Sequence, residues 1–156
     1  MTRITNIIVM IILGCFCGCT AKGIPVVSVT GTVTYQGKPI ANALVAFIPQ
    51  SSELRGASAM TKDNGTFTLL TQGAATSGAM AGEYKILVSK FIEVDNFGKE
   101  VIREPSGPYN PNNPPPLQIQ YPQKNLLPEK YNNAETTPLT ANITKGKNHL
   151  VLQLDD

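Results

Sequence analysis

The sequence lacks tryptophan, contains one histidine and three cysteines, and has charged side chains at only 15% of its 156 positions. The three cysteines occupy positions 15, 17 and 19, so the remaining chain contains neither a disulfide framework nor a cysteine-based metal site. The single histidine, His149, excludes the two-histidine iron and zinc sites of many metalloenzymes. We therefore expect no metal ion and no cofactor.

Groups suited to catalysis are also scarce. No Gly-x-Ser-x-Gly motif is present to place a nucleophilic serine. His149 falls out of phase with the leucines of its predicted strand, so we expect it to face solvent. The acidic residues at 93, 95, 100 and 104 lie beside Lys99 and Arg103, where they are typical of solvated charge and not of a rigid carboxylate pair. The sequence predicts no catalytic residue and a protein that is not an enzyme.

The balance of charge excludes another class of function. Thirteen basic residues nearly balance eleven acidic ones, which gives a formal net charge of +2. A nucleic-acid-binding face needs basic residues clustered on one surface or along one segment. No such cluster is present in the sequence, so we expect no nucleic-acid partner.

The first 19 residues have the features of an export signal. Arg3 supplies positive charge, and residues 7–13 form an apolar run. The uncharged stretch extends at most to Cys19, which is short of the ~20 residues that a membrane-spanning helix needs. The run leads into residues 12–15, Ile-Leu-Gly-Cys, which resemble a lipobox, the peptidase site that ends in a lipid-modified cysteine. We therefore predict an exported lipoprotein.

Two of the cysteines are candidates for lipidation. Ile12 and Leu13 fit the lipobox better and favour Cys15, whereas Cys19 would leave no spare thiol in an oxidising compartment. We predict lipidation at Cys15, with Cys19 as the alternative. No retention aspartate follows either cysteine, which favours the outer membrane. The predicted location is the cell envelope, lipid-anchored to the outer membrane on its periplasmic or surface face.

After a predicted tether at residues 20–26, residues 27–156 show the periodicity of β-strands. Residues 27, 29, 31, 33 and 35 share one face, and the residues between them are Ser28 and threonines. The segment 43–48 is apolar on both faces and is predicted to be a central strand. Asn-Gly within residues 63–65 predicts a hairpin with Phe67 and Leu69 facing inward.

Three later segments, at 82–89, 139–143 and 150–154, also alternate apolar and polar residues. The whole pattern predicts about seven strands and no helix. Two packed sheets are the economical way to bury one face of each strand. The predicted fold class is therefore all-β, a roughly seven-stranded Ig-like β-sandwich.

A long proline-rich loop is predicted at residues 93–137, because eight prolines and little periodicity fall in this stretch. Tyr109, Tyr121 and Tyr131 are spaced along it. Tyrosines beside prolines are suited to contact a protein partner or to stack on sugar rings. These three residues are the candidate ligand contacts, and the alternative is that they hold the loop against the sandwich.

Several segments together resemble carboxypeptidase regulatory-like domains, a transthyretin-like sandwich family. Residues 29–40 followed by 43–47 resemble the first hairpin of that family, and residues 63–69, Asp-Asn-Gly-Thr-Phe-Thr-Leu, resemble its second signature. Residues 82–86, Gly-Glu-Tyr-Lys-Ile, resemble the third, with Ala81 in place of the usual proline. The tail from 127 to 148 is similar to that of a bacterial lipoprotein subgroup. The resemblance implies a transthyretin-like sandwich and an accessory, non-catalytic role.

Two readings of the function follow from these features. The first is a membrane-anchored domain that binds an envelope protein or packs in a surface scaffold. The second is a carbohydrate-binding module that contacts envelope polysaccharide through its tyrosines, against which the absence of tryptophan counts. An unrecognised hydrolase is a weaker third, because the chain lacks a catalytic constellation.

Overall fold

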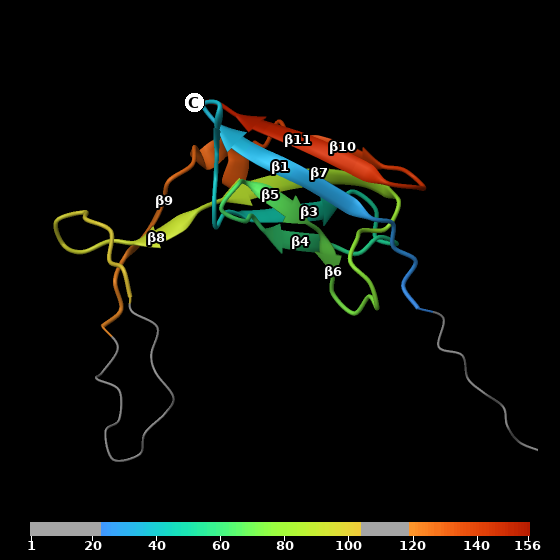
Figure 1. Cartoon of the computed structure of the whole chain (residues 1–156), viewed down its shortest axis with the longest axis horizontal. Helices are drawn as coiled ribbons and strands as arrows, with labels where there is room; N and C mark the ends of the chain where they lie inside the picture. Colours follow the sequence, from blue (N-terminus) through green and yellow to red (C-terminus); the bar gives the residue numbers. More distant parts are fainter. Residues whose placement is uncertain (1–22, 104–118) are drawn as a thin grey trace, which may run out of the picture.

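The computed structural model describes residues 23–103 and 119–156, which form two packed β-sheets and a two-stranded arm (Figure 1). The strands are β1 (Val29–Tyr35), β2 (Lys38–Pro39), β3 (Leu44–Pro49), β4 (Ala57–Met60), β5 (Thr66–Thr68), β6 (Leu70–Thr71), β7 (Gly82–Ser89), β8 (Phe91–Glu93), β9 (Gln123–Asn125), β10 (Thr140–Ile143) and β11 (Asn148–Leu154), and η1 is a 3₁₀ helix at Glu129–Asn132. The predicted all-β sandwich is confirmed. The strand count is higher than seven because several strands have only two or three residues.

The first sheet is built around β1. Its partner β11 runs parallel to it over the full length of both strands, from the pair Val29–Asn148 to the pair Tyr35–Leu154. The opposite edge of β1 holds β5 along its first half and β2 along its second, both antiparallel. β1 and β11, which are far apart in the sequence, are thus neighbours in one sheet.

The second sheet has the strand order β10-β7-β3-β4-β6, with every pair antiparallel. β3 lies between β7 and β4, so the prediction of a central strand at 43–48 is confirmed. Its inward residues Val45 and Phe47 are fully buried, and the Phe47 ring packs against Tyr84 of β7 at a centroid distance of 5.8 Å. The outward residue Leu44 remains 42% exposed.

One hydrophobic core lies between the two sheets. Val29 and Val33 of β1 are completely buried, and the threonines between them are partly exposed, as the alternation predicted. Gly31 lies between the two valines on the same inward face and opposite Phe67 of β5. A Cβ atom at Gly31 would lie 2.5 Å from the Phe67 ring. The missing side chain therefore makes room for the aromatic ring.

The Asp63-Asn64-Gly65 turn forms, but the two strands that flank it, β4 and β5, are not paired with each other. Backbone bonds from Gly65 to Lys62 and from Lys62 to Thr66 close the turn. β5 then pairs with β1 in the first sheet, and β6 returns to pair with β4 in the second. The predicted hairpin is therefore a corner between the sheets. Phe67 and Leu69 face inward as predicted, with 2% and 0% of their surface exposed.

The prediction of one long loop at residues 93–137 is corrected by the described parts of that segment. β8 and β9 pair across it, an isolated bridge joins Val94 to Glu100, and η1 follows β9. Strands of three residues are too short to show alternation, so they could not be predicted from the periodicity of the sequence. In the described residues no helix is long and apolar enough to cross a membrane.

Replacing Gly31 with alanine tests the packing of Phe67 on β1. The added methyl group would meet both the Phe67 ring and the carbonyl oxygen of Leu150, so we expect a loss of about 1–3 kcal/mol of stability. Urea unfolding followed by circular dichroism measures it. The control is Gly56→Ala, whose Cβ would have its nearest contact at 3.4 Å and should leave the midpoint unchanged or slightly higher. Equal midpoints for both variants would contradict the packing described here.

Candidate functional site

Of the residues that the sequence singled out, Cys15, Cys19 and Tyr109 lie outside the described residues. Tyr121 immediately precedes Pro122 and β9, beside Arg103. His149 is exposed, as predicted, and its Nδ1 lies 3.2 Å from the Thr30 hydroxyl on the neighbouring strand.

Tyr131 is buried, and its prediction as a ligand contact is wrong. The side chain belongs to η1, is only 4% exposed and packs in the core. Its hydroxyl donates to the Asp155 carbonyl at 3.1 Å and accepts from the Asp155 amide at 3.0 Å. Tyr131 therefore holds η1 against the end of β11, which is the alternative role that the sequence left open.

The most distinctive feature outside the sandwich is an arm, which we define as residues 90–103 and 119–126. β8 follows β7 after one residue and pairs with β9 (Figure 1). At the base, the Asn125 side chain accepts hydrogen bonds from the amides of Lys90 and Leu127, and the Leu126 amide donates to Lys90. Leu127 is buried in the core, so the base of the arm is fixed to the sandwich.

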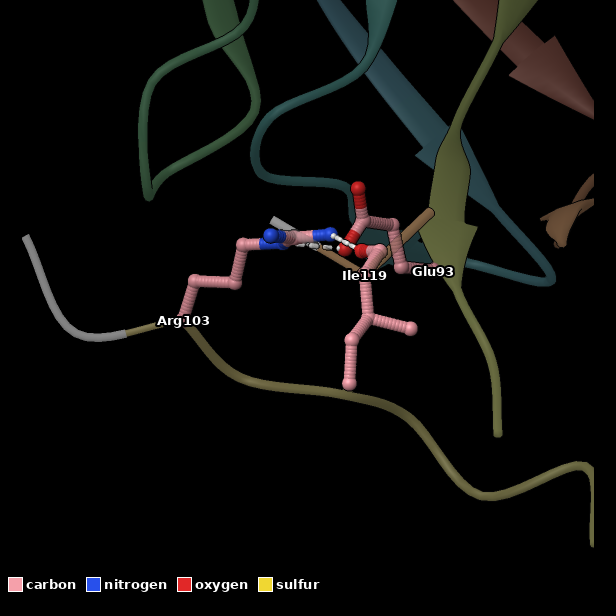
Figure 2. Close-up of polar contacts among 3 residues, drawn as sticks. All are labelled: Glu93, Arg103 and Ile119. Atoms are coloured by element: carbon pink, nitrogen blue, oxygen red, sulfur yellow. Dashed lines mark hydrogen bonds and ion pairs between the residues drawn. The ribbon is translucent and has the colours of Figure 1, made fainter. Parts of the chain in front are cut away.

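Arg103 connects the two sides of the arm (Figure 2). Its Nε donates to Oε2 of Glu93 at 2.5 Å, and one Nη donates to the Ile119 carbonyl at 2.7 Å. Its guanidinium carbon lies 5.5 Å from the centre of the Tyr121 ring, within range of a cation–π interaction. The hydrogen bond to Glu93 raises the pKa of Arg103 above its usual value. Glu93 and Arg103, which the sequence indicated as solvated charges, therefore form an ion pair.

A recess of about 550 Å³ lies around this arginine. The groups that line it are mainly polar: Glu93, Arg103, Ile119, Gln120, Tyr121 and Gln123. Since Glu93 neutralises Arg103, the recess has little net charge. It is suited to hydrogen bonds with an uncharged polar group, and Arg103 already covers part of the Tyr121 ring.

A tight turn at residues 95–98 forms the tip of the described arm. The Asp95 carboxylate accepts hydrogen bonds from the amides of Phe97 and Lys99, each at 2.9 Å, and Gly98 has a φ of +78° that suits glycine. Phe97 is 95% exposed. The turn therefore holds an aromatic side chain in water on an ordered backbone.

Exposed apolar side chains gather on this arm. Of nine large hydrophobic residues that are exposed in the described chain, five belong to it: Phe91 (50%), Phe97 (95%), Ile102 (84%), Ile119 (64%) and Leu126 (42%). Single exposed hydrophobic residues are normal on a protein surface, but more than half of those in the described chain belong to this short arm. The arm is therefore the candidate functional site. Sequence reasoning missed it, although Asp-Asn-Phe-Gly at 95–98 is a recognisable turn sequence.

Two further observations concern metal binding and acid–base chemistry. The described residues contain no group of three or more histidine, cysteine, aspartate or glutamate side chains placed to hold a metal ion. A larger recess of about 910 Å³ is lined by residues of β3, β4 and β6 and of the adjoining loops, and includes one ionisable side chain, Arg55. A lone arginine offers no partner for proton transfer at neutral pH, so this recess gives no basis for an acid–base reaction.

Comparisons with known proteins assign no family. No family model and no curated protein matches the chain. A crystal structure of a DUF3823 family protein from Parabacteroides merdae is similar over 83% of this chain, with 19% sequence identity and a TM-score of 0.36. The chain spans 46% of the length of that protein. At this TM-score the similarity supports no conclusion about function.

Replacing Arg103 with alanine tests the connection across the arm. The substitution removes the hydrogen bond to Ile119, which spans the two sides, together with a partly exposed ion pair worth about 0.2–1 kcal/mol, so local opening should rise by up to about fivefold. The Val94 amide, which donates to Pro122 between the two sides, reports this opening through hydrogen exchange. The urea midpoint of the whole domain should not change. Lys99→Ala is the matched control, and equal exchange in both variants would contradict the role of Arg103.

Proposed function

We propose that this chain is an exported, lipid-anchored and non-catalytic β-sandwich protein that binds a protein of the cell envelope through its β8–β9 arm. The observation that supports binding most directly is the exposed Phe97 on a hydrogen-bonded turn, with other apolar side chains around the arm. Buried aromatic anchors dominate the energy of protein interfaces. An ordered turn also loses little conformational freedom when its side chain is buried by a partner.

The placement of the arm agrees with this function. The arm projects from one end of the sandwich, and residues 23–28, which precede β1, leave from the opposite end (Figure 1). A lipid at Cys15 or Cys19 would be joined to the domain through these residues. The anchor and the arm would therefore contact different surroundings, with the arm directed to a partner protein and the lipid to the proposed outer membrane.

Carbohydrate binding is a weaker proposal. Sugar rings stack on exposed aromatic faces, and the cation of Arg103 already lies over the Tyr121 ring. Tyr131 is buried and contributes nothing to a sugar platform. The polar recess is compatible with a sugar hydroxyl, but the apolar residues of the arm are better matched to an apolar depression on a protein.

A photo-reactive phenylalanine analogue at position 97 tests the docking arm. In intact cells we expect ultraviolet light to join the protein to one companion protein of reproducible mass, because Phe97 would be buried in that partner. The same analogue at Asp63, on an exposed turn at the corner between the sheets, is the control. Adding Ile102→Ser should weaken the product at position 97. A polysaccharide adduct would favour the alternative, and equal products from both positions would contradict the proposal.

Cysteine substitution tests the anchor separately. Cys15→Ser should abolish the diacylglycerol that mass spectrometry detects on the N-terminal peptide, because serine lacks the sulfur that forms the thioether. Cys19→Ser should leave the modification in place. The opposite result would move the lipid to Cys19, and an unmodified wild-type chain would contradict the proposed lipoprotein.

A further inference from the structure

β11 forms an open edge of the first sheet. It pairs with β1 on one side, and no strand among the described residues pairs with its other side. The end strands of the second sheet are shorter, with four residues in β10 and two in β6. β11 has seven residues, so it is the longest open edge in the described structure.

The register shows which backbone groups of β11 face this edge. The Asn148 amide donates to Ser28, and the Leu154 carbonyl accepts from Gln36, both on the β1 side. In a parallel ladder, alternate residues of a strand bond to the same neighbour. Even-numbered residues therefore bond to β1, and the amides and carbonyls of His149, Val151 and Gln153 point outward. These three residues present six backbone hydrogen-bonding groups.

Both ends of β11 are held in place. At its start, the Asn148 side chain donates to the carbonyls of Thr144 and Gly146 and accepts from the Thr144 amide. At its end, the Tyr131 hydroxyl bonds to the outward amide and carbonyl of Asp155, so the open part of the edge ends at Gln153. The edge is thus already in the conformation that a further strand would need, which lowers the entropic cost of pairing.

The strand also lacks the usual obstacles to pairing. Natural edge strands are blunted by lysine, proline, bulges or short length. Residues 148–154 contain neither lysine nor proline, and their pairing with β1 is continuous. Val151 lies at the centre and is 61% exposed. An exposed valine flanked by unpaired backbone groups is a favourable cross-strand contact for a second β-branched residue.

The charged residues beside β11 indicate which strand would pair with its open edge. Lys147 precedes the strand, Asp155 follows it, and both are exposed. If two β11 strands pair antiparallel with Val151 opposite Val151, each residue faces the residue of the other copy that lies equally far on the other side of position 151. Lys147 of each copy then faces Asp155 of the other, and His149 faces Gln153. The strand is therefore complementary to itself in charge and in hydrogen bonding.

We propose that two copies of this chain associate through β11, antiparallel and related by a two-fold axis at Val151. The outward groups of residues 149, 151 and 153 form six intermolecular hydrogen bonds, and two Lys147–Asp155 ion pairs flank them. Such an isologous interface closes on itself and stops at a dimer. This surface is separate from the arm, which extends β7 of the other sheet, so the inference does not rest on the proposed function.

Disulfide cross-linking of the full-length protein in cells tests the register. In the Val151→Cys dimer, the Cα atoms of the two introduced cysteines would lie about 5.5 Å apart, which is within the Cα–Cα range of disulfides. We expect a covalent dimer whose linked peptides, identified by mass spectrometry, both contain position 151. In the His149→Cys dimer, the two introduced cysteines would be offset by four residues along the strands. Their Cα atoms would then lie about 13 Å apart, so no 149–149 link should form. Equal linking of both variants, or no 151–151 link, would overturn the proposal.

Reversal of the flanking charges tests the same interface without cysteines. Lys147→Glu would place like charges opposite each other at two positions, and we expect the dimer association constant to fall roughly 5- to 30-fold. Adding Asp155→Lys restores opposite charges and should restore the wild-type constant. Sedimentation of the full-length protein in mild detergent measures both. A monomeric wild type, or no recovery in the double variant, would contradict the proposed pairing.

Discussion

The parallel pairing of β1 with β11 is the constraint on which the rest of the structure depends. It joins the first long strand of the domain to the last over seven residues, so everything between them must fold back within that frame. The inward side of β1 can accept Phe67 only because Gly31 has no side chain. The ring then fills the core that the five-stranded sheet closes from the other side.

The arm follows from the same frame. β7 crosses the second sheet and continues through Lys90 into β8, so a strand that is buried along one face becomes an exposed projection at the end of the sandwich. Asn125 fixes the base, and Arg103 joins the two sides further out. The scaffold is rigid where it carries the arm, and the exposed Phe97 is presented on an ordered turn. The proposed binding role needs both this hydrogen-bonded support and the exposed apolar side chain.

Strands that alternate over five or more residues, such as β1 and β7, were predictable from the sequence, because burial of one face of a sheet imposes a period of two. β3 was predictable as a short apolar run, which is typical of a central strand. The separation of β5 and β6 into different sheets after Gly65 was not predictable, because a turn sequence does not determine which strands the flanking segments pair with. The arm was hidden for a related reason. β8 and β9 pair across about thirty residues and are too short to show a period. The sequence left two roles open for Tyr131, because its hydrogen-bond partner, the Asp155 backbone, is 24 residues away in the sequence.

The most direct test of the proposed binding through the arm is hydroxyl-radical footprinting of the wild-type protein, first in isolated envelopes and then after purification. Phe97 and Met60 are both exposed in the isolated domain, at 95% and 57%, and Met60 lies on β4, away from the arm. If the arm binds an envelope protein, Phe97 is protected in envelopes and oxidised after purification, whereas Met60 is oxidised equally in both. Equal oxidation of Phe97 in the two samples would contradict it.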